Sequence, residues 1–218
     1  MSEHRSSLLF DMNWRFPVEP ELHSRGIRVI AGVDEAGRGS LAGPVVSAAV
    51  ILDPDDPIDG IRDSKQLRPA VRERLAGAIR QRALAWAVEF SHREVIDRLN
   101  VLEATKLSMR RAIENLRVRP ELILIDAVRL SDLSVNSMSL IKGDQLSVNV
   151  GAASILAKVE RDAWMTGIAS GYPGYGFEIH KGYGTRRHLL KLRELGPCEI
   201  HRCTYKPVIE AVENGRLQ

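Results

Sequence analysis

The sequence has few cysteines and no long apolar run. Its 218 residues contain only two cysteines, Cys198 and Cys203, which excludes the disulfide framework of a small secreted domain. Residues 1–20 do not have a basic start followed by an apolar stretch, as a secretory signal would. No segment approaches the length of a membrane span. We therefore expect a cytoplasmic protein with reduced thiols and no membrane partner.

Aromatic residues and net charge are also scarce. Aromatics make up 5% of the chain against 44% hydrophobic residues in all, so the core must be mainly aliphatic. The net charge is only +3, which is compatible with a polyanionic partner but does not require one. The length suits one large domain, or one domain with a small appendage. We expect a monomer.

Hydrophobic periodicity predicts strands first and then strands alternating with helices. The predicted strands cover residues 27–33, 44–52, 85–90, 122–125 and 134–141. The predicted helices begin at Pro69, after Asn100 and near residue 149. The first two strands flank a short turn and should pair antiparallel, and the all-apolar run 122–125 is typical of a strand buried on both faces. The pattern predicts an α/β fold: a mixed sheet flanked by helices, with a helical C-terminal extension.

Acidic residues stand at the ends of three predicted strands. Asp34 and Glu35 follow the first strand, Asp126 ends the run 122–125, and Asp144 follows the strand that ends at residue 141. If these strands are neighbours, four carboxylates converge, and their repulsion calls for cations between them. Oxygen ligands favour Mg²⁺ or Mn²⁺. Two such ions about 3.5–4 Å apart are a standard device for attack on a phosphodiester.

Acids at strand ends also serve as turn residues and helix caps, so a structural role for Asp126 or Asp144 remains open. The adjacent pair Asp34 and Glu35 is harder to explain in that way, because it comes directly between an apolar strand and a glycine-rich turn.

That turn, residues 37–43, lacks the Gly-Lys-Ser/Thr ending of a P-loop, and a strand rather than a helix follows it. A nucleotide-binding enzyme is therefore the weaker hypothesis. A tight hairpin that needs positive φ angles explains the glycines. Such a turn can still bring backbone amides close to a ligand. Arg38 at its tip can bond a phosphate or a ribose hydroxyl.

Several motifs together resemble the bacterial ribonuclease HII family. The first is Gly-Val-Asp-Glu-Ala-Gly-Arg-Gly at residues 32–39, with Leu-Ala-Gly-Pro-Val-Val at 41–46. Further matching segments are Asp-Ser-Lys at 63–65, the helix start at 100–105, Lys-Gly-Asp at 142–144, the helix 152–162, His-Lys-Gly-Tyr-Gly-Thr at 180–185 and His-Arg at 201–202. The resemblance spans about residues 27–207.

The resemblance implies a ribonuclease H-like fold and a metal-dependent endoribonuclease. Such an enzyme hydrolyses the RNA strand of RNA–DNA hybrids and cuts 5′ of single ribonucleotides embedded in duplex DNA, leaving a 3′-hydroxyl and a 5′-phosphate. The implied catalytic metal ligands are Asp34, Glu35, Asp126 and Asp144. The implied readers of the ribose 2′-hydroxyl are Gly37, Arg38 and Gly39. Tyr183 would lie against the nucleotide at an RNA-to-DNA junction.

Three positions depart from the family pattern without removing a ligand. Ser40 stands where the family usually has proline, Ala127 where it has glycine, and Tyr205 where it has phenylalanine. Ala127 follows the third acid and is expected to alter the local turn. Residues 208–218 show no obvious clamp-binding motif, so we assign none.

We divide the chain into an N-terminal arm (1–26), a catalytic core (27–170) and a C-terminal substrate-binding extension (171–218). From His180 to Lys206 the extension carries seven Lys or Arg residues, two acids and three histidines. This excess favours phosphate contact, although a solvated helix face is the alternative. Lys65 is a further candidate for phosphate contact.

Two other hypotheses remain. A non-catalytic nucleic-acid-binding module would use the basic extension, but it leaves the clustered acids unexplained. A zinc site built from Cys198, His201 and Cys203 would need a fourth ligand, and none is near in the sequence. The spacing of Lys158 and Asp162 predicts an ion pair along the long helix, which gives Asp162 a structural role.

Overall fold

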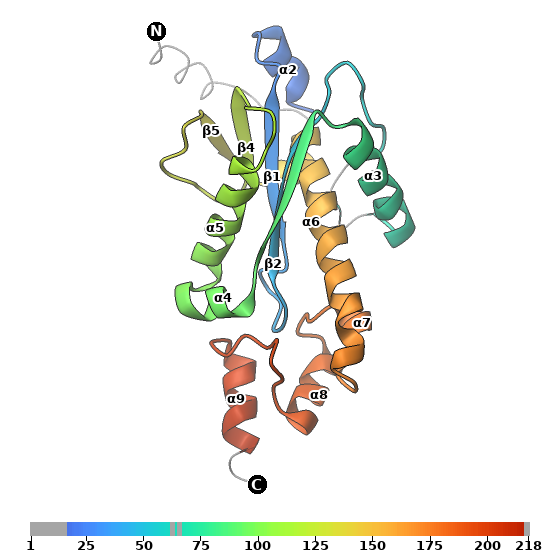
Figure 1. Cartoon of the computed structure of the whole chain (residues 1–218), viewed down its shortest axis with the longest axis vertical. Helices are drawn as coiled ribbons and strands as arrows, with labels where there is room; N and C mark the ends of the chain where they lie inside the picture. Colours follow the sequence, from blue (N-terminus) through green and yellow to red (C-terminus); the bar gives the residue numbers. More distant parts are fainter. Residues whose placement is uncertain (1–16, 62–63, 65–66, 216–218) are drawn as a thin grey trace.

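A computed structural model describes residues 17–61, 64 and 67–215 of the chain, so Lys65 lies outside the described residues. A five-stranded sheet in the order β3-β2-β1-β4-β5 forms its centre (Figure 1). The strands are β1 (Ile30–Ala36), β2 (Val45–Ile51), β3 (Ala85–Ser91), β4 (Leu122–Asp126) and β5 (Ser137–Leu140). The main helices are α2 (Glu19–Ser24), α3 (Pro69–Arg82), α4 (Arg93–Leu99), α5 (Val101–Glu114), α6 (Val148–Gly167), α7 (Phe177–His180), α8 (Arg186–Leu195) and α9 (Lys206–Gly215). Short 3₁₀ turns cover Gly143–Gln145 and Ala169–Gly171.

The sheet is mixed, as the strand pattern predicts. β1 pairs antiparallel with β2 from Ala31↔Ile51 to Ala36↔Val46, and β2 pairs antiparallel with β3. On its other side β1 runs parallel to β4, and β4 runs parallel to β5. The predicted antiparallel pair and the predicted mixed α/β sheet are therefore confirmed.

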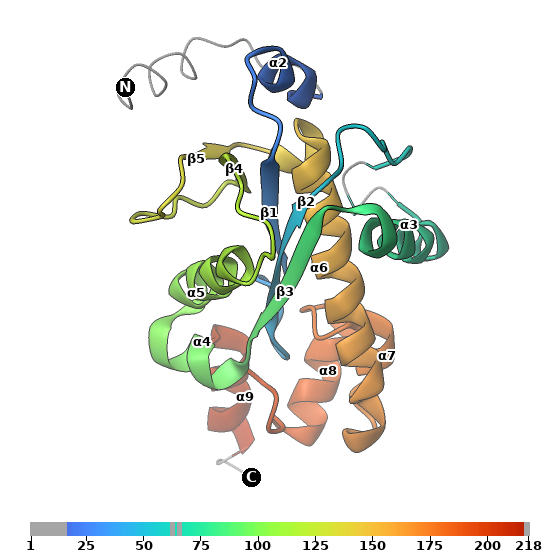
Figure 2. The same ribbon diagram turned by 45° about the horizontal axis from the view of Figure 1, so that its top comes forward.

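Helices cover both faces of the sheet, with α5 on one side and α3 and α6 on the other (Figure 2). The α5 side of the core is formed by alternate strand residues such as Val33 and Ile123 packed against Met109. The α6 side is formed by the intervening residues, such as Val50, packed against Ile155. Both layers are aliphatic, which agrees with the low aromatic content.

The long helix α6 approaches β1 closely at Gly32. A Cβ atom on Gly32 would lie 2.0 Å from the backbone carbonyl carbon of Asn149, so only glycine fits at this crossing. Ser147 caps the helix, because its side chain accepts a hydrogen bond from the Val150 amide. Glu19 of α2 is buried at the same end and accepts hydrogen bonds from the Ser147 hydroxyl and the Asn149 amide. α2 is thereby tied to the start of α6.

The C-terminal extension joins the sheet through the glycine-rich turn between β1 and β2. The Leu41 amide donates to the Gly182 carbonyl at 2.9 Å, and the Arg202 amide donates to the Leu41 carbonyl at 2.9 Å. Ser40 forms an antiparallel bridge with Tyr183, and Ala42 forms one with His201. The turn therefore lies between two segments of the extension, near α7, α8 and α9 (Figure 1).

The structure differs from the sequence-based expectation at β1, at α4 and at β5, which covers only Ser137–Leu140 of the predicted strand 134–141. β1 begins and ends three residues later than predicted, so Asp34 and Glu35 lie within the strand, opposite Ala48 and Ser47. The cause is the ladder with β2, which continues up to the turn. Helix α4 was not expected; it ends at Asn100, which has a positive φ of 73° and caps α5 by accepting from the amides of Leu102 and Glu103. The predicted cap is confirmed.

No helix within residues 17–61 and 67–215 is both long and apolar enough to cross a membrane.

The residue that follows Asp126 has an unusual backbone conformation. Ala127 has a φ of 49°, a region that favours glycine. Its amide donates to the Leu140 carbonyl at 2.9 Å, which fixes the conformation. The backbone of Ala127 is therefore strained, because alanine stands where the family usually has glycine.

We expect Ala127→Gly to stabilise the protein, because glycine relieves a left-handed conformation that costs an alanine about 1 kcal/mol. For a chain of this size the midpoint of thermal unfolding should rise by about 2–4 °C. The matched control is Ala70→Gly, at an exposed position in α3, which should lower the midpoint because glycine disfavours a helix. A lower midpoint for Ala127→Gly would contradict the assignment of strain.

Candidate active site

The parallel pairing of β1 with β4 brings two of the predicted acids side by side. Val33 is in register with Ile125, so the next residues, Asp34 and Asp126, are neighbours across the two strands. Asp34 is only 3% exposed. Strand alternation places both side chains on the α6 face of the sheet. Ser154 of α6 lies close to Asp34 and favours the ionised form of its carboxyl.

The other two acids, Glu35 and Asp144, lie in neighbouring segments of the backbone. Glu35 follows Asp34 in β1, and its amide donates to Asp34 Oδ1 at 2.7 Å. Asp144 is 5% exposed and lies in the 3₁₀ turn after β5. The amide of the preceding Gly143 donates to Asp126 Oδ1 at 2.7 Å, which ties this turn to the end of β4. The structure thus places all four acids at one end of three adjacent strands.

The proximity of these carboxylates changes their acid–base behaviour. The pKa of Asp34 is raised well above 3.8, first because the side chain is buried and then because the negative charges of Glu35 and Asp126 oppose its ionisation. The nearby Ser154 hydroxyl and the hydrogen bond from the Glu35 amide oppose this shift only in part. An ionised Asp34 is therefore destabilising in the metal-free protein.

The donor set suits a hard divalent cation. All four side chains offer carboxylate oxygens, the ligands that Mg²⁺ and Mn²⁺ prefer. Among the described residues, no three His, Cys, Asp or Glu side chains form a ready-made metal cluster. Mutual repulsion holds bare carboxylates apart, and a bound cation would remove that repulsion. The chemistry of the four side chains therefore fits a site for a hard divalent cation.

The glycine-rich turn follows directly. Gly37 has a φ of 93°, and a Cβ atom on it would lie 2.0 Å from Arg161 Nε, so both its conformation and its packing require glycine. Arg38 and Gly39 are exposed at the tip. Arg38 Nη1 donates to Glu35 Oε1 at 3.1 Å, which links the turn to the cluster of acids.

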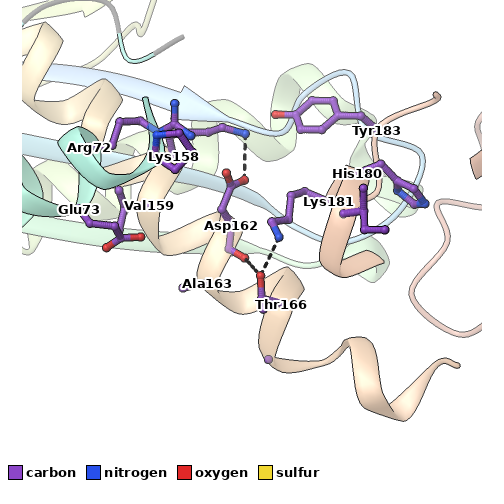
Figure 3. A pocket seen from close by; sticks show the side chains of 13 residues that line it. Arg72, Glu73, Lys158, Val159, Asp162, Ala163, Thr166, His180, Lys181 and Tyr183 are labelled. Carbon is purple, nitrogen blue, oxygen red and sulfur yellow. Dashed lines mark hydrogen bonds and ion pairs between the residues drawn. The ribbon is translucent and has the colours of Figure 1, made fainter. Parts of the chain in front are cut away.

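Tyr183 forms the bridge to Ser40 of this turn and helps to line a groove of about 790 Å³ between α3, α6 and α7. Lys158 Nζ lies 5.0 Å from the ring centroid and also pairs with Asp162 at 2.9 Å, which confirms the predicted ion pair (Figure 3). The Arg161 guanidinium carbon lies 4.9 Å from the same centroid. Two cations therefore hold an aromatic ring beside the glycine-rich turn.

Part of the predicted basic surface is buried. His188 and His201 are fully buried and share a 3.0 Å hydrogen bond between their Nε2 atoms. Burial lowers the pKa of each to about 4, so both are neutral. Because His201 Nδ1 accepts from the Cys198 amide at 2.9 Å, its Nε2 carries the proton and donates to His188, whose Nδ1 then donates to the Tyr183 carbonyl. These histidines support Tyr183 and do not contribute positive charge.

The same contacts argue against the zinc hypothesis. Both ring nitrogens of His201 are engaged in hydrogen bonds, and among the described residues no three His, Cys, Asp or Glu side chains are placed to share a metal ion.

Two residues of the site were not singled out from the sequence. Arg161 and Arg202 are both fully buried beside the glycine-rich turn. The helical spacing did indicate that Arg161 is buried, because position 161 continues the inward-facing row of small α6 residues. An arginine is nevertheless normally expected to be exposed to solvent.

Comparison with known proteins identifies the fold and then the family. The chain superposes on the crystal structure of ribonuclease H2 from Pyrococcus horikoshii with a TM-score of 0.74 and 27% identity, covering 87% of this chain and 99% of that one. It superposes on a Bst ribonuclease HIII in complex with Mn²⁺ with a TM-score of 0.65 and 23% identity, covering 90% and 73% of the two chains. The fold is therefore that of the type 2 ribonucleases H.

The relatives narrow this class to one family. The chain is 50% identical to ribonuclease HII of Syntrophomonas wolfei over 91% of this chain and 78% of that protein. It is 52% identical to ribonuclease HII of Nitrosococcus oceani over 84% of this chain and 92% of that protein. The family model for ribonuclease HII matches residues 31–208. The chain belongs to the ribonuclease HII family, whose members are RNA-cleaving hydrolases.

We expect Asp34→Asn to stabilise the metal-free protein. Because folding raises the Asp34 pKa above 3.8, the parent loses stability as pH rises from about 4 through the raised value. Asparagine keeps the acceptor for the Glu35 amide but carries no charge. Removing this unfavourable charge should therefore raise the unfolding midpoint of the variant above that of the parent at pH 7.

Thermal melts in a chelating buffer at pH 4–8 measure this effect, with Asp59→Asn at an exposed position as the control. The difference between Asp34→Asn and the parent should grow with pH. An Asp34→Asn protein that melts with the parent throughout this range would show that the acids do not repel one another as described.

Proposed function

We propose that this chain is an endoribonuclease that hydrolyses the RNA strand of RNA–DNA hybrids and cuts 5′ of single ribonucleotides in duplex DNA. One observation carries the proposal: the strand that brings Asp34 beside Asp126 continues without interruption into the exposed turn at Arg38 and Gly39. A phosphodiester held at the acids therefore has its sugar beside the turn. That juxtaposition suits a nuclease that selects its substrate by the 2′-hydroxyl.

We assign Asp34, Glu35, Asp126 and Asp144 as the ligands of Mg²⁺ or Mn²⁺. When bound, such ions activate water and stabilise the leaving oxygen in phosphodiester hydrolysis. The chain's own contribution is to hold four carboxylates at the ends of three paired strands. Gly143 restrains Asp126 through its amide, and Arg38 restrains Glu35.

We assign sugar recognition to Gly37, Arg38 and Gly39, and contact with the nucleotide at the RNA-to-DNA junction to Tyr183. The ring of Tyr183 is partly exposed and held by two cations, so it offers a fixed apolar surface. Exposed cations of the extension, such as Arg186 and Arg187, suit contact with backbone phosphates. Lys65, outside the described residues, remains a proposed phosphate contact. We propose that the protein acts as a monomer in the cytoplasm.

A cleavage assay tests this function. The substrate is a DNA duplex with one embedded ribonucleotide, incubated with and without Mg²⁺. The parent should cut 5′ of the ribonucleotide and leave a 3′-hydroxyl, and a chelator should abolish cutting. Asp34→Asn should lose at least about 10²-fold in rate, the scale of one removed electrostatic group, and should still bind the duplex.

Asp59→Asn, a charge change at an exposed position that is not one of the four acids, should cut at the parent rate. Asp34→Asn cutting at the parent rate would overturn the metal-ligand assignment. Efficient cutting of long hybrids without cutting at the single ribonucleotide would instead indicate the substrate range of another ribonuclease H class.

A further inference from the structure

Two guanidinium groups lie buried under the glycine-rich turn. Arg161 and Arg202 are both fully buried and are the largest fully buried side chains in the described chain. Burying a charge is costly unless it is well compensated. Their hydrogen-bond acceptors are backbone carbonyl oxygens of the turn and one tyrosine hydroxyl, rather than carboxylates. We call Arg161 and Arg202 the guanidinium pair.

Arg202 bonds the carbonyls at the tip and at the end of the turn. Its Nη2 donates to the Gly37 carbonyl at 2.7 Å, and its Nη1 donates to the Arg38 carbonyl at 2.8 Å. Its Nε donates to the Gly43 carbonyl at 3.0 Å. The planar fork of an arginine suits three oxygens at fixed directions, whereas a lysine offers one point charge.

The orientation of these carbonyls determines where the amides of the turn point. In a trans peptide the C=O and N–H groups point in opposite directions. The Gly37 carbonyl shares its peptide with the Arg38 amide, and the Arg38 carbonyl shares its peptide with the Gly39 amide. Because both carbonyls face buried Arg202, both amides face away from it, at the exposed tip. Within the described part of the chain neither amide has a hydrogen-bond acceptor.

Arg161 holds the other end of the turn and joins it to Tyr183. Its Nε donates to the Pro44 carbonyl at 2.9 Å, and its Nη2 donates to the Ala42 carbonyl at 3.2 Å. Its Nη1 has no hydrogen-bond acceptor among the described residues, and the π face of Tyr183 lies 4.9 Å from its guanidinium carbon. Arg161 also occupies the space that a side chain at Gly37 would need.

We propose that Arg161 and Arg202 are positioning residues that determine sugar selectivity. The guanidinium pair holds the carbonyls of the turn inward and thereby directs the Arg38 and Gly39 amides toward an acceptor oxygen of the substrate. It also fixes the distance between Tyr183 and these two amides. The acceptor is the 2′-oxygen of a ribonucleotide. This inference rests on the proposed function and names the residues that make its sugar recognition rigid.

The test compares two duplexes that differ by one hydroxyl. In an Asp34→Asn background, which binds without cutting, the Kd is measured in Mg²⁺ for a duplex with one ribonucleotide and for the same duplex made entirely of DNA. The ratio of the two Kd values is the sugar preference. Arg202→Lys should lower this preference by about 3- to 10-fold, the scale of one lost hydrogen bond to the substrate, with little change in the Kd for DNA.

Arg111→Lys is the matched control, because this arginine lies exposed on α5, outside the basic extension. It should keep the preference of the background protein. If Arg202 had only a structural role, Arg202→Lys would weaken binding of both duplexes together and would leave the ratio of the two Kd values unchanged. That result would overturn the inference, and so would a folded variant in which neither Kd changes.

Thermal melting establishes whether Arg202→Lys folds. If it does not, Arg161→Lys is measured by the same ratio of Kd values, since it leaves the hydrogen bonds of Arg202 in place and loosens only the far end of the turn and Tyr183. A background protein with no sugar preference at all would contradict the proposed function rather than the role of the guanidinium pair. Cleavage of the single-ribonucleotide duplex by the parent enzyme distinguishes these two failures.

Discussion

The parallel register between β1 and β4 is the constraint on which the site depends. It places Asp34 beside Asp126, and the extension of the sheet to β5 brings the turn with Asp144 to the same edge. The close crossing of α6 over Gly32 stabilises this register from one face and places Ser154 against Asp34. Shifting the register by one residue would turn Asp126 to the opposite face of the sheet and separate the acids.

The arrangement costs stability where it supports function. Buried carboxylates repel one another, which raises the pKa of Asp34. Ala127 has a left-handed backbone conformation next to Asp126, and two buried guanidiniums lie under a turn whose amides at the tip have no protein acceptor among the described residues. A bound cation would relieve the repulsion between the carboxylates, and a substrate oxygen would give the amides at the tip an acceptor. Strain of this kind is typical of binding sites.

The elements of the fold could largely be predicted from the sequence, because apolar periodicity and a few caps determine them. The run 122–125, the helix from Pro69 and the cap at Asn100 all follow from local chemistry. The end of β1 was placed too early, because the ladder to β2 is a tertiary contact that local periodicity does not report.

Less of the candidate site than of the fold could be predicted from the sequence. Strand ends indicated the acids, but the roles of the histidines and arginines in the extension depend on burial. His188, His201 and Arg202 count as basic in the sequence, yet all three are fully buried against the turn or Tyr183. Contacts between residues 37–44 and residues 161–202 join segments more than a hundred positions apart, so no local pattern could reveal them.

The central claim is that one cluster of carboxylates at the ends of β1, β4 and β5 holds the metal. Anomalous X-ray scattering from crystals of the parent protein soaked in Mn²⁺ tests this claim directly. The account predicts Mn²⁺ bonded to carboxylate oxygens of Asp34 and Asp126, with Glu35 and Asp144 in the same cluster. Mn²⁺ bound at saturating concentration only elsewhere on the protein would contradict it.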